Sequence, residues 1–479
     1  MTARPAAETV GFDPHVFVMF GATGDLARRR LIPAIYRLLE SRGFEDRIHL
    51  VGVATSRLDD TAYRSLVTES LVEAGWEEEA VARWCFRSIS FASVADGFGD
   101  LSRKVSELEH QYDLPGNRAF YLAIPPGVFV DTIEGLASEG LTKSEGWMRL
   151  VVEKPFGTDL RSAKKLNEMM YRHFTEDQIF RIDHYLAKET VQNLLAFRFA
   201  NMLFESSWNR NQIDSVEITV AETLGLEGRS RYFEKAGVVR DMIQNHLMQV
   251  LTLVAMEPPV RLEANAIRDE KVKVLKAIYP VTRAAVTRGR YTAGEIDGER
   301  VPGYLEEDGV APDSTTETYA SIRIDVDNWR WRGVPFVLRA GKRLPARITQ
   351  IAVRYKEPPV SLFEVDGTCR VHANVLFITL QPNEGFHLTF DVKRPGEGME
   401  LVTQDLEFHY ADAFGPLPGA YETLIADLLA GDQTLFVRGD EAEEAWRILE
   451  PALDLPTQPL EYPAGTWGPE GSIRRPPRP

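Results

Sequence analysis

A short buried strand that stops at a glycine turn constrains the fold of this chain more than any other stretch of its sequence. The strand is expected over His15–Phe20, and the turn after it reads Gly21-Ala22-Thr23-Gly24-Asp25-Leu26. A helical stretch follows through Leu39, and Ile48–Ala54 predicts a second buried strand. Glycines at the end of the first strand of a β-α-β unit let backbone N–H groups approach a pyrophosphate. The pattern predicts a dinucleotide-binding unit that holds its cofactor on this turn.

Two later segments repeat the arrangement of a strand followed by a Gly/Pro loop. Residues 119–124 end in Pro125-Pro126-Gly127, and Met148–Val152 runs into Glu153-Lys154-Pro155-Phe156-Gly157. Strands that alternate with helices predict a parallel sheet with ligands at its carboxyl edge, so Pro126 is expected near the cofactor. The G-x-x-G pattern is by itself also typical of an ordinary tight turn, and this context favours the α/β Rossmann-like interpretation.

The end of the second strand bears on which cofactor is bound. NAD-binding proteins usually place an acid there for the ribose 2′-hydroxyl, whereas NADP-binding proteins offer a basic residue. Here the segment reads Ala54-Thr55-Ser56-Arg57, and the first acid is Asp59. Arg57 and the triplet Arg28-Arg29-Arg30 favour NADP, with NAD use left open, although the triplet is equally typical of a solvated helix face.

Composition sets limits on the partners of the chain. With 479 residues it can form two substantial cores, and its net charge of −16 disfavours binding to nucleic acid or to acidic membrane surfaces. Any phosphorylated ligand must therefore meet locally concentrated positive charge. Two distant cysteines, Cys85 and Cys369, predict a reducing, cytoplasmic setting. Residues 1–10 lack the pattern of a secretory signal, no apolar run is long enough to span a membrane, and disorder is expected over residues 474–479.

The segment that follows residues 178–183, a predicted strand, gathers cationic and polar side chains. His184 is expected to begin a helix, which would put His184 and Lys188 on one face and Tyr185 beside them. Such a group at a helix N-terminus suits a phosphate dianion. The alternative interpretation is a surface ion-pair network.

Residues 237–251 predict a buried helix that is apolar on nearly every side. Asp241, Asn245 and His246 interrupt its apolar surface, and buried polar groups need partners or a ligand. A structural role is the more common one for a lone buried histidine. Nothing in the residue pattern brings His246 to Asp183.

After residue 183 the pattern changes to strand-like runs with few helices between them. The runs cover residues 215–223, 315–326, 336–338, 348–355, 375–380 and 386–392. They predict a large, mostly antiparallel sheet with helices on one face, which makes an α+β domain. We therefore expect a cofactor domain over residues 1–183 and a second domain over 184–479.

Six segments, in this order, resemble the glucose-6-phosphate dehydrogenases over essentially the whole chain. They read GATGDLARRRLIPAIY, EKPFG, RIDHYLAKETVQNLLAFRFAN, YFEKAGVVRDMIQNHL, DNWRWRGVPFVLRAGKRL and GDQTLFVRGDE. The resemblance implies oxidation of glucose 6-phosphate at C1 to the 6-phospho-lactone with NADP, the first oxidative step of the pentose phosphate pathway. It also implies pairing of subunits through the large sheet, as a homodimer or homotetramer.

The resemblance further implies roles for individual residues. His246 matches the general base, and Asp183 matches the carboxylate that orients it. The other matching positions are His184, Tyr185 and Lys188 for the 6-phosphate; Glu222 and Asp241 for sugar hydroxyls; Lys342 and Arg347 for substrate contacts from the second domain; and Lys154 and Pro155 for the junction of nicotinamide and sugar. A histidine base suits the removal of the C1 hydroxyl proton near neutral pH, and a buried carboxylate keeps its tautomer.

The chain departs from the family pattern at three positions. Ala187 stands where a glycine is usual, Arg30 replaces a lysine, and Thr55 replaces the arginine that binds the 2′-phosphate. Arg57 lies two residues later, so both NADP use and dual NADP/NAD use are consistent with the sequence.

Two alternatives come from other classes. An oxidoreductase of the glucose–fructose type would act on an unphosphorylated sugar, which gives the His184, Tyr185 and Lys188 group no anion to bind. A cofactor-binding sensor without chemistry would be expected to lose His246 or Asp183. The scattered histidines offer no H-x-x-x-H or cysteine cluster, so no metal is expected.

Overall fold

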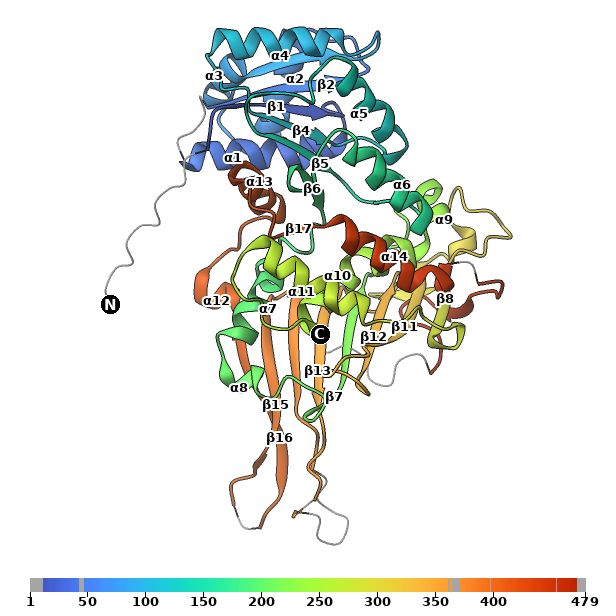
Figure 1. Cartoon of the computed structure of the whole chain (residues 1–479). Coiled ribbons are helices and arrows are strands. Elements are labelled where there is room, and N and C mark those ends of the chain that lie inside the picture. Colours follow the sequence, from blue (N-terminus) through green and yellow to red (C-terminus); the bar gives the residue numbers. More distant parts are fainter. Residues whose placement is uncertain are drawn as a thin grey trace.

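The structure is a computed structural model, and it describes residues 12–42, 47–360, 362–363, 371–396, 398–453 and 455–471. The expectations for residues 1–10, for Cys369 and for the tail from residue 474 lie outside the described residues. Two sheets organise the chain (Figure 1): a helix-covered sheet in the upper half and a long, curved sheet in the lower half.

The upper sheet has seven strands in the order β17-β6-β5-β4-β1-β2-β3. Strands β1 to β6 are parallel to their neighbours, and β17 runs antiparallel to β6. The strands are β1 His15–Phe20, β2 Ile48–Ala54, β3 Ile89–Ser93, β4 Arg118–Leu122, β5 Met148–Val152, β6 Ile179–Ile182 and β17 Phe436–Val437. The predicted bounds of β1, β2 and β5 match these elements, because each is a buried apolar run that ends at a glycine, polar or proline-containing loop.

Helices flank this sheet on both faces, which is the doubly wound arrangement. They are the π-helical η1 Ala27–Leu31, α1 Ile32–Arg42, α2 Asp60–Glu73, α3 Glu78–Ser88, α4 Gly99–Gln111, η2 Pro126–Val128, α5 Phe129–Ser138, α6 Leu160–Tyr171 and η3 Glu176–Gln178. Asp59 caps α2 through a 2.8 Å bond from the Ala62 N–H. Pro33 is the second residue of α1, which continues directly from η1 as one helical stretch.

The lower sheet has nine strands in the order β16-β15-β14-β13-β7-β12-β11-β8-β18. Most neighbours are antiparallel, and the exceptions are β12 with β7 and β18 with β8. The strands are β7 Ile213–Ala221, β8 Val286–Thr292, β11 Tyr319–Asp325, β12 Pro335–Gly341, β13 Ile348–Tyr355, β14 Val375–Gln381, β15 Gly385–Lys393, β16 Leu401–His409 and β18 Leu460–Pro463. The predicted large, mostly antiparallel sheet is confirmed, although the sequence prediction missed β8, β16 and β18. A hairpin of β9 Gly294–Ile296 and β10 Glu299–Val301 lies apart from it.

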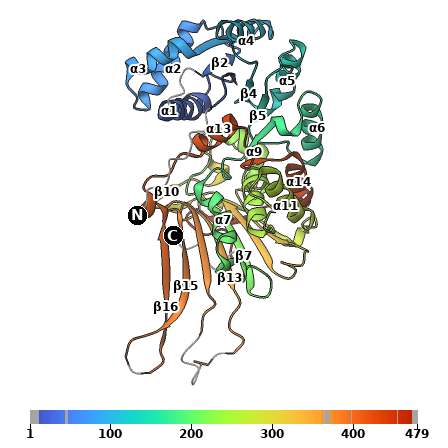
Figure 2. The ribbon, with the colours of Figure 1, turned by 60° about the vertical axis from the view of Figure 1, so that its left-hand side comes forward.

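Most helices of the C-terminal part of the chain lie on one side of this sheet (Figures 1 and 2). The helices of this part are α7 Glu189–Phe199, α8 Met202–Glu205, α9 Ser230–Val238, the π-helical η4 Val239–Leu247, α10 Met248–Ala255, α11 Ala264–Lys276, α12 Tyr410–Phe414, α13 Ala420–Ala430 and α14 Gly439–Leu453; two 3₁₀ turns, η5 Arg283–Ala285 and η6 Tyr304–Glu306, complete them. The α+β architecture expected for the second domain is confirmed. None of the helices within the described ranges is both long and apolar enough to cross a membrane.

The C-terminal part of the chain returns to the upper sheet. Strand β17 pairs with β6, α13 packs against α1, and α14 packs against α6. The Trp446 indole N–H donates to the Phe156 carbonyl at 2.9 Å, which ties α14 to the loop after β5. The upper sheet is therefore completed by residues far beyond position 183.

Candidate active site

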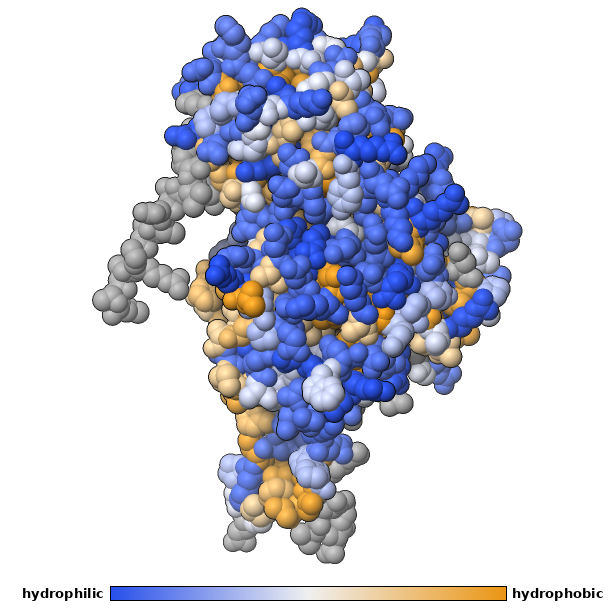
Figure 3. All heavy atoms as spheres, in the orientation of Figure 1, coloured by the Kyte–Doolittle hydropathy of each residue, from blue (hydrophilic) through white to orange (hydrophobic). Residues whose placement is uncertain are grey.

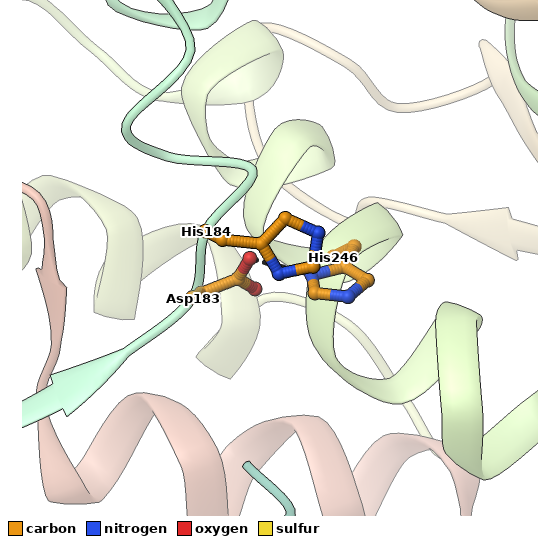
Figure 4. A group of neighbouring side chains, drawn as sticks. All are labelled: Asp183, His184 and His246. Atoms are coloured by element: carbon orange, nitrogen blue, oxygen red, sulfur yellow. Dashed lines mark hydrogen bonds and ion pairs between the residues drawn. The ribbon is translucent and has the colours of Figure 1, made fainter. Parts of the chain in front are cut away.

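A buried carboxylate–imidazole pair lies where the two halves of the molecule meet. Asp183 follows β6, His246 lies on η4, and Asp183 Oδ1 is 2.5 Å from His246 Nδ1. Both side chains are buried, with exposed fractions of 1% and 0%. Figure 4 shows the Asp183 carboxylate directed at the His246 ring, with His184 above them. The fold thus makes a contact that the residue pattern could not establish.

The helix predicted over residues 237–251 is wrong as one regular element. Gly237 has φ +62°, and the chain then forms the π-helical η4 before α10 begins at Met248. A Cβ on Gly237 would lie 2.3 Å from Glu317 Oε1, an oxygen that accepts a bond from the Val239 N–H at 3.2 Å. The buried Glu317 carboxylate thus occupies the start of η4, and only glycine fits beside it.

The helix predicted to begin at His184 is also wrong. Residues 184–188 form a turn, and α7 begins at Glu189. Asp183 Oδ1 accepts a bond from the Tyr185 N–H at 3.0 Å, which satisfies a backbone group in the turn. The Tyr185 ring stacks on the His246 ring with centroids 4.2 Å apart, and the His184 ring meets it edge-on at 4.6 Å. His184 and Tyr185 therefore lie against His246 although they are not on a helix.

Lys154 links the pair to the sugar-binding candidates. Its Nζ lies 2.9 Å from His246 Nε2 and donates to the Asp241 carbonyl at 3.0 Å, and the peptide bond from Lys154 to Pro155 is cis. The Asp241 carboxylate also accepts a bond from the Tyr232 hydroxyl at 3.2 Å. Tyr232 was missed by the sequence prediction, and its position nine residues before Asp241 gives no helical-face signal.

Burial controls the charges of this cluster. Burial lowers the pKa of His246 below 6.5, and the Asp183 carboxylate partly opposes that shift. Burial alone would raise the pKa of Asp183, but the His246 imidazole outweighs it and holds the pKa below its usual value. Burial, followed by the charge of His246, lowers the pKa of His184 to about 3. A neutral imidazole beside an ionised carboxylate can accept a proton.

Lys188 forms the cationic end of the site. Its Nζ donates to Gln381 Oε1 and lies 4.5 Å from the centroid of the Tyr185 ring. Burial lowers the Lys188 pKa to about 8; Glu384 opposes the shift, while Arg347 adds to it. Arg347 is exposed and lines a cavity of about 360 Å³ with residues of β14 to β16. Gln381 was missed, because only the fold brings the end of β14 to residues 184–188.

Glu222 and Lys342 meet at the ends of two adjacent strands. β7 and β12 are parallel with Ala221 opposite Gly341, so the next residues are neighbours, and Lys342 Nζ lies 2.6 Å from Glu222 Oε2. Burial would raise the pKa of Asp241, but the charges of Lys154 and Lys342 outweigh it and lower that pKa. The predicted sugar-binding residues therefore surround one polar region.

The glycine turn after β1 packs closely against the ends of the neighbouring strands, so that only a residue without a Cβ fits at position 21. Gly21 has φ +75°, and a Cβ there would lie 2.2 Å from the Ala123 carbonyl oxygen. The Gly21 and Ala22 N–H groups bond to the Val53 carbonyl at 2.9 and 3.2 Å, and the Gly24 N–H bonds to the Gly21 carbonyl at 2.9 Å. Thr23 is half-buried, Gly24 and Asp25 are exposed, Leu26 begins η1, and Pro126 is exposed at the start of η2 after β4.

The arginines at this edge differ in what they contact. Arg28 Nε donates to Ser70 Oγ at 3.1 Å, and Arg29 pairs with Asp25 at 3.6 Å. Arg30 is exposed and its charge lowers the pKa of Tyr421 against the larger effect of burial. Arg57 pairs with Asp96 at 2.8 Å. The turn of residues 21–24 at the carboxyl end of β1, with Gly24 exposed, and the exposed Arg30 and Arg57 fit a phosphorylated dinucleotide.

One group of side chains in the described ranges has the spacing of metal ligands. It consists of Asp183, His184 and His246, whose candidate ligand atoms lie within 4.8 Å of one another. Since Asp183 and His246 are hydrogen-bonded to each other, the arrangement is that of an acid–base pair.

Family profiles match nearly the whole chain. A profile described as "Glucose-6-phosphate dehydrogenase, NAD binding domain" matches residues 18–193, and one described as "Glucose-6-phosphate dehydrogenase, C-terminal domain" matches residues 195–475. The glucose-6-phosphate 1-dehydrogenase of Aggregatibacter actinomycetemcomitans is 45% identical over 466 residues, which cover 94% of this chain and 93% of the relative. That of Treponema pallidum (strain Nichols) is 42% identical over 479 residues, with 96% and 93% covered.

Solved structures give the same result. A glucose-6-phosphate dehydrogenase in complex with its substrate glucose 6-phosphate superposes with a TM-score of 0.88 at 37% identity, and the match covers 96% of each chain. A glucose-6-phosphate 1-dehydrogenase from Mycobacterium avium superposes with a TM-score of 0.81 at 36% identity over 96% of each chain.

Proposed function

The chain belongs to the glucose-6-phosphate dehydrogenase family, and from that premise we propose which of its residues carry out the reaction. The protein is an NADP-dependent oxidoreductase that oxidises glucose 6-phosphate at C1 to the 6-phospho-lactone. One observation supports the assignment of roles above all others: the buried Asp183–His246 pair, with Lys154 at the second ring nitrogen.

We assign the general base to His246. Asp183 bonds to Nδ1, so Nε2, which Lys154 contacts in this structure, is the ring nitrogen that would accept the proton of the C1 hydroxyl. Asp183 fixes the tautomer and stabilises the imidazolium that forms, as carboxylates do in related pairs. When bound, the nicotinamide accepts the hydride from C1. Lys154, which lies 2.9 Å from Nε2, is placed to contact the sugar where the proton leaves.

The remaining polar residues hold the sugar phosphate. Lys188, Tyr185 and His184 bind the 6-phosphate, with Arg347 adding positive charge from the lower sheet. Glu222, Asp241 and Lys342 bind sugar hydroxyls from the ends of β7, η4 and β12. Binding energy from the remote phosphate can thereby hold C1 in place.

The upper sheet binds the cofactor. The turn of Gly21, Ala22, Thr23, Gly24, Asp25 and Leu26 would hold the pyrophosphate, and Pro126, Lys154 and Pro155 would border the nicotinamide half. Thr55 stands where the family has the arginine that binds the 2′-phosphate. Arg57 and Arg30 supply the positive charge for this phosphate instead. Because Arg57 is exposed and already paired with Asp96, we propose that NAD is used as well.

The test is the initial rate of nicotinamide reduction with glucose 6-phosphate and with unphosphorylated glucose, each with NADP⁺ and NAD⁺. We expect turnover with the phosphorylated sugar at far lower concentration than with glucose. Equal kcat/KM for the two sugars would contradict the phosphate site and favour the glucose–fructose type, and no rate with either sugar would contradict the catalytic roles.

We also propose a homodimer or homotetramer that pairs through the large sheet, in the cytoplasm. Apolar side chains gather along one edge of the lower half, over α8, α12 and β16 (Figure 3), and Leu406 of β16 is 60% exposed. Functionally, residues 1–183 form the cofactor domain and residues 184–479 the substrate and dimerisation domain. Light scattering coupled to gel filtration measures the mass, and a monomer at working concentration would contradict the pairing.

A further inference from the structure

An exposed ion pair joins the ends of two neighbouring strands at the cofactor edge. Strands β2 and β3 are parallel, with Ala54 opposite Ser93; Arg57 and Asp96 each follow their strand by three residues. Their side chains are 73% and 79% exposed and lie 2.8 Å apart. We propose that this pair recognises the adenosine ribose of both cofactors: Arg57 binds the 2′-phosphate of NADP, and Asp96 binds the 2′-hydroxyl of NAD. The proposal rests on the proposed function.

The pair lies where the ribose is expected. In dinucleotide folds the residues just after the second strand meet the ribose, while the pyrophosphate lies on the first glycine turn. Here the glycine turn and the end of β2 are adjacent, because the Gly21 and Ala22 N–H groups bond to the Val53 carbonyl near the end of β2. Thr55 and Ser56 carry no charge, so Arg57 is the first cation after the strand.

Other acids near this edge already hold backbone groups. Asp59 caps α2 through the Ala62 N–H, and Asp60 accepts from the Phe91 N–H, both at 2.8 Å. Asp100 accepts from the Ser93 N–H at 3.2 Å. Within the described residues Asp96 accepts no such bond, and its carboxylate pairs with the Arg57 side chain. It is therefore the carboxylate that can change partners when a cofactor binds.

Charge makes the two halves of the pair oppose each other. A 2′-phosphate attracts Arg57 but is repelled by Asp96, which also competes for the same guanidinium. A 2′-hydroxyl can donate to Asp96 while Arg57 remains paired. Asp96 thus weakens binding of NADP and strengthens binding of NAD, and an asparagine there should separate the two cofactors.

The test is a fluorescence titration of the full-length enzyme with NADPH and with NADH, without sugar. We expect Asp96→Asn to lower the Kd for NADPH about three- to tenfold and to raise the Kd for NADH by a similar factor. Arg57→Ala should raise the Kd for NADPH about tenfold or more, with the Kd for NADH changed less than about twofold. Glu79→Gln is the control, because it removes an exposed, ion-paired acid of the same domain from α3.

Two outcomes would contradict the proposed role of the Arg57–Asp96 pair. Asp96→Asn could change the Kd for both cofactors by the same factor, or it could raise the Kd for NADPH, which would mean that Asp96 merely orients Arg57. If the unmodified enzyme bound neither NADPH nor NADH, both the proposed cofactor site and the proposed role of the Arg57–Asp96 pair would be wrong. If it bound both cofactors but the Asp96→Asn variant did not change the two Kd values in opposite directions, only the proposed role of the pair would be wrong. The ratio of kcat/KM values for NADP⁺ and NAD⁺ should follow the Kd ratio.

Discussion

The sugar end and the cofactor end of this site are built in different ways. At the sugar end, charged side chains on η4 and after β6, β7 and β12 are buried or half-buried and already paired: Asp183 with His246, and Glu222 with Lys342. At the cofactor end, the backbone of one turn provides the cradle, and the cations Arg30 and Arg57 are exposed. Preorganised charges favour rate, since they need no reorganisation during the reaction. We infer that the chemistry depends on tertiary packing, whereas the cofactor choice depends on a few exposed side chains.

Removing the base should produce the largest effect and test the claim for the sugar end. We expect His246→Asn to lower kcat by roughly 10²–10⁴-fold or more, because the hydroxyl proton loses its acceptor. The Kd for NADPH should stay within about twofold, as the cofactor edge is separate. His110→Asn, an exposed change on α4, is the control. A nearly normal kcat would refute the role of His246.

Removing the cation should affect binding more than chemistry. We expect Lys188→Ala to raise the KM for glucose 6-phosphate about ten- to hundredfold, because charge-assisted bonds to the phosphate are lost. Lys273→Ala, exposed on α11, should leave KM unchanged. Steady-state kinetics distinguish the two, and an unchanged KM in Lys188→Ala would contradict the phosphate site.

A methyl group added at Gly21 tests the backbone cradle. Both Gly21 and Gly140 have positive φ, but only at Gly21 would a Cβ meet another atom, the Ala123 carbonyl oxygen at 2.2 Å. Gly140→Ala should therefore cost only the φ strain, about 1–2 kcal/mol of unfolding free energy. Gly21→Ala should cost more and also weaken NADPH binding. Denaturant unfolding and the NADPH titration measure these effects, and equal losses in both variants would show that the cradle has room.

The pH dependence should report the two ends of the sugar site. His246 must be neutral to accept a proton, and its pKa is lowered, so the acid limb of kcat/KM should lie below pH 6.5. Lys188 must be charged to bind phosphate, so kcat/KM should fall as pH rises through its pKa of about 8. Lys188→Ala should lose the alkaline limb and keep the acid limb. An alkaline limb that persisted in this variant would assign it to another group.

The smallest effect should come from the arginine triplet. Arg29 is 80% exposed and pairs with Asp25, which is itself exposed. Exposed ion pairs of this kind contribute little, so Arg29→Ala should change the KM for NADP⁺ less than about twofold. A tenfold rise in this KM would mean that the triplet binds the cofactor directly. The cofactor end would then depend on specific ionic contacts, as the sugar end does.

The sequence predicted those elements whose signal is local. Strands β1, β2 and β5 are buried apolar runs and were located correctly. Strand β16 was missed because most of its residues are exposed and several are polar, so its pattern resembles a loop. Tyr185 lies in a turn although the sequence after Asp183 suits a helix, since the Asp183 carboxylate binds the Tyr185 N–H. No local signal indicates that η4 is π-helical.

The site residues show the same division. The resemblance named Asp183 and His246, and the fold then placed their side chains in contact across 63 positions of sequence. Gln381 and Tyr232 were missed because their contacts with Lys188 and Asp241 depend on how β14 and α9 pack. Side-chain partners that come from separate elements cannot be read from spacing alone.

The pairing of β17 with β6 sets an order of events during synthesis. Strand β6 leads directly to Asp183, yet Val437, which pairs with Arg181 of that strand, follows 256 residues later. A nascent chain therefore carries β6 as an open sheet edge until almost all of the protein has left the ribosome. Chains that terminate early would keep this adhesive edge and would lack the strand that covers it.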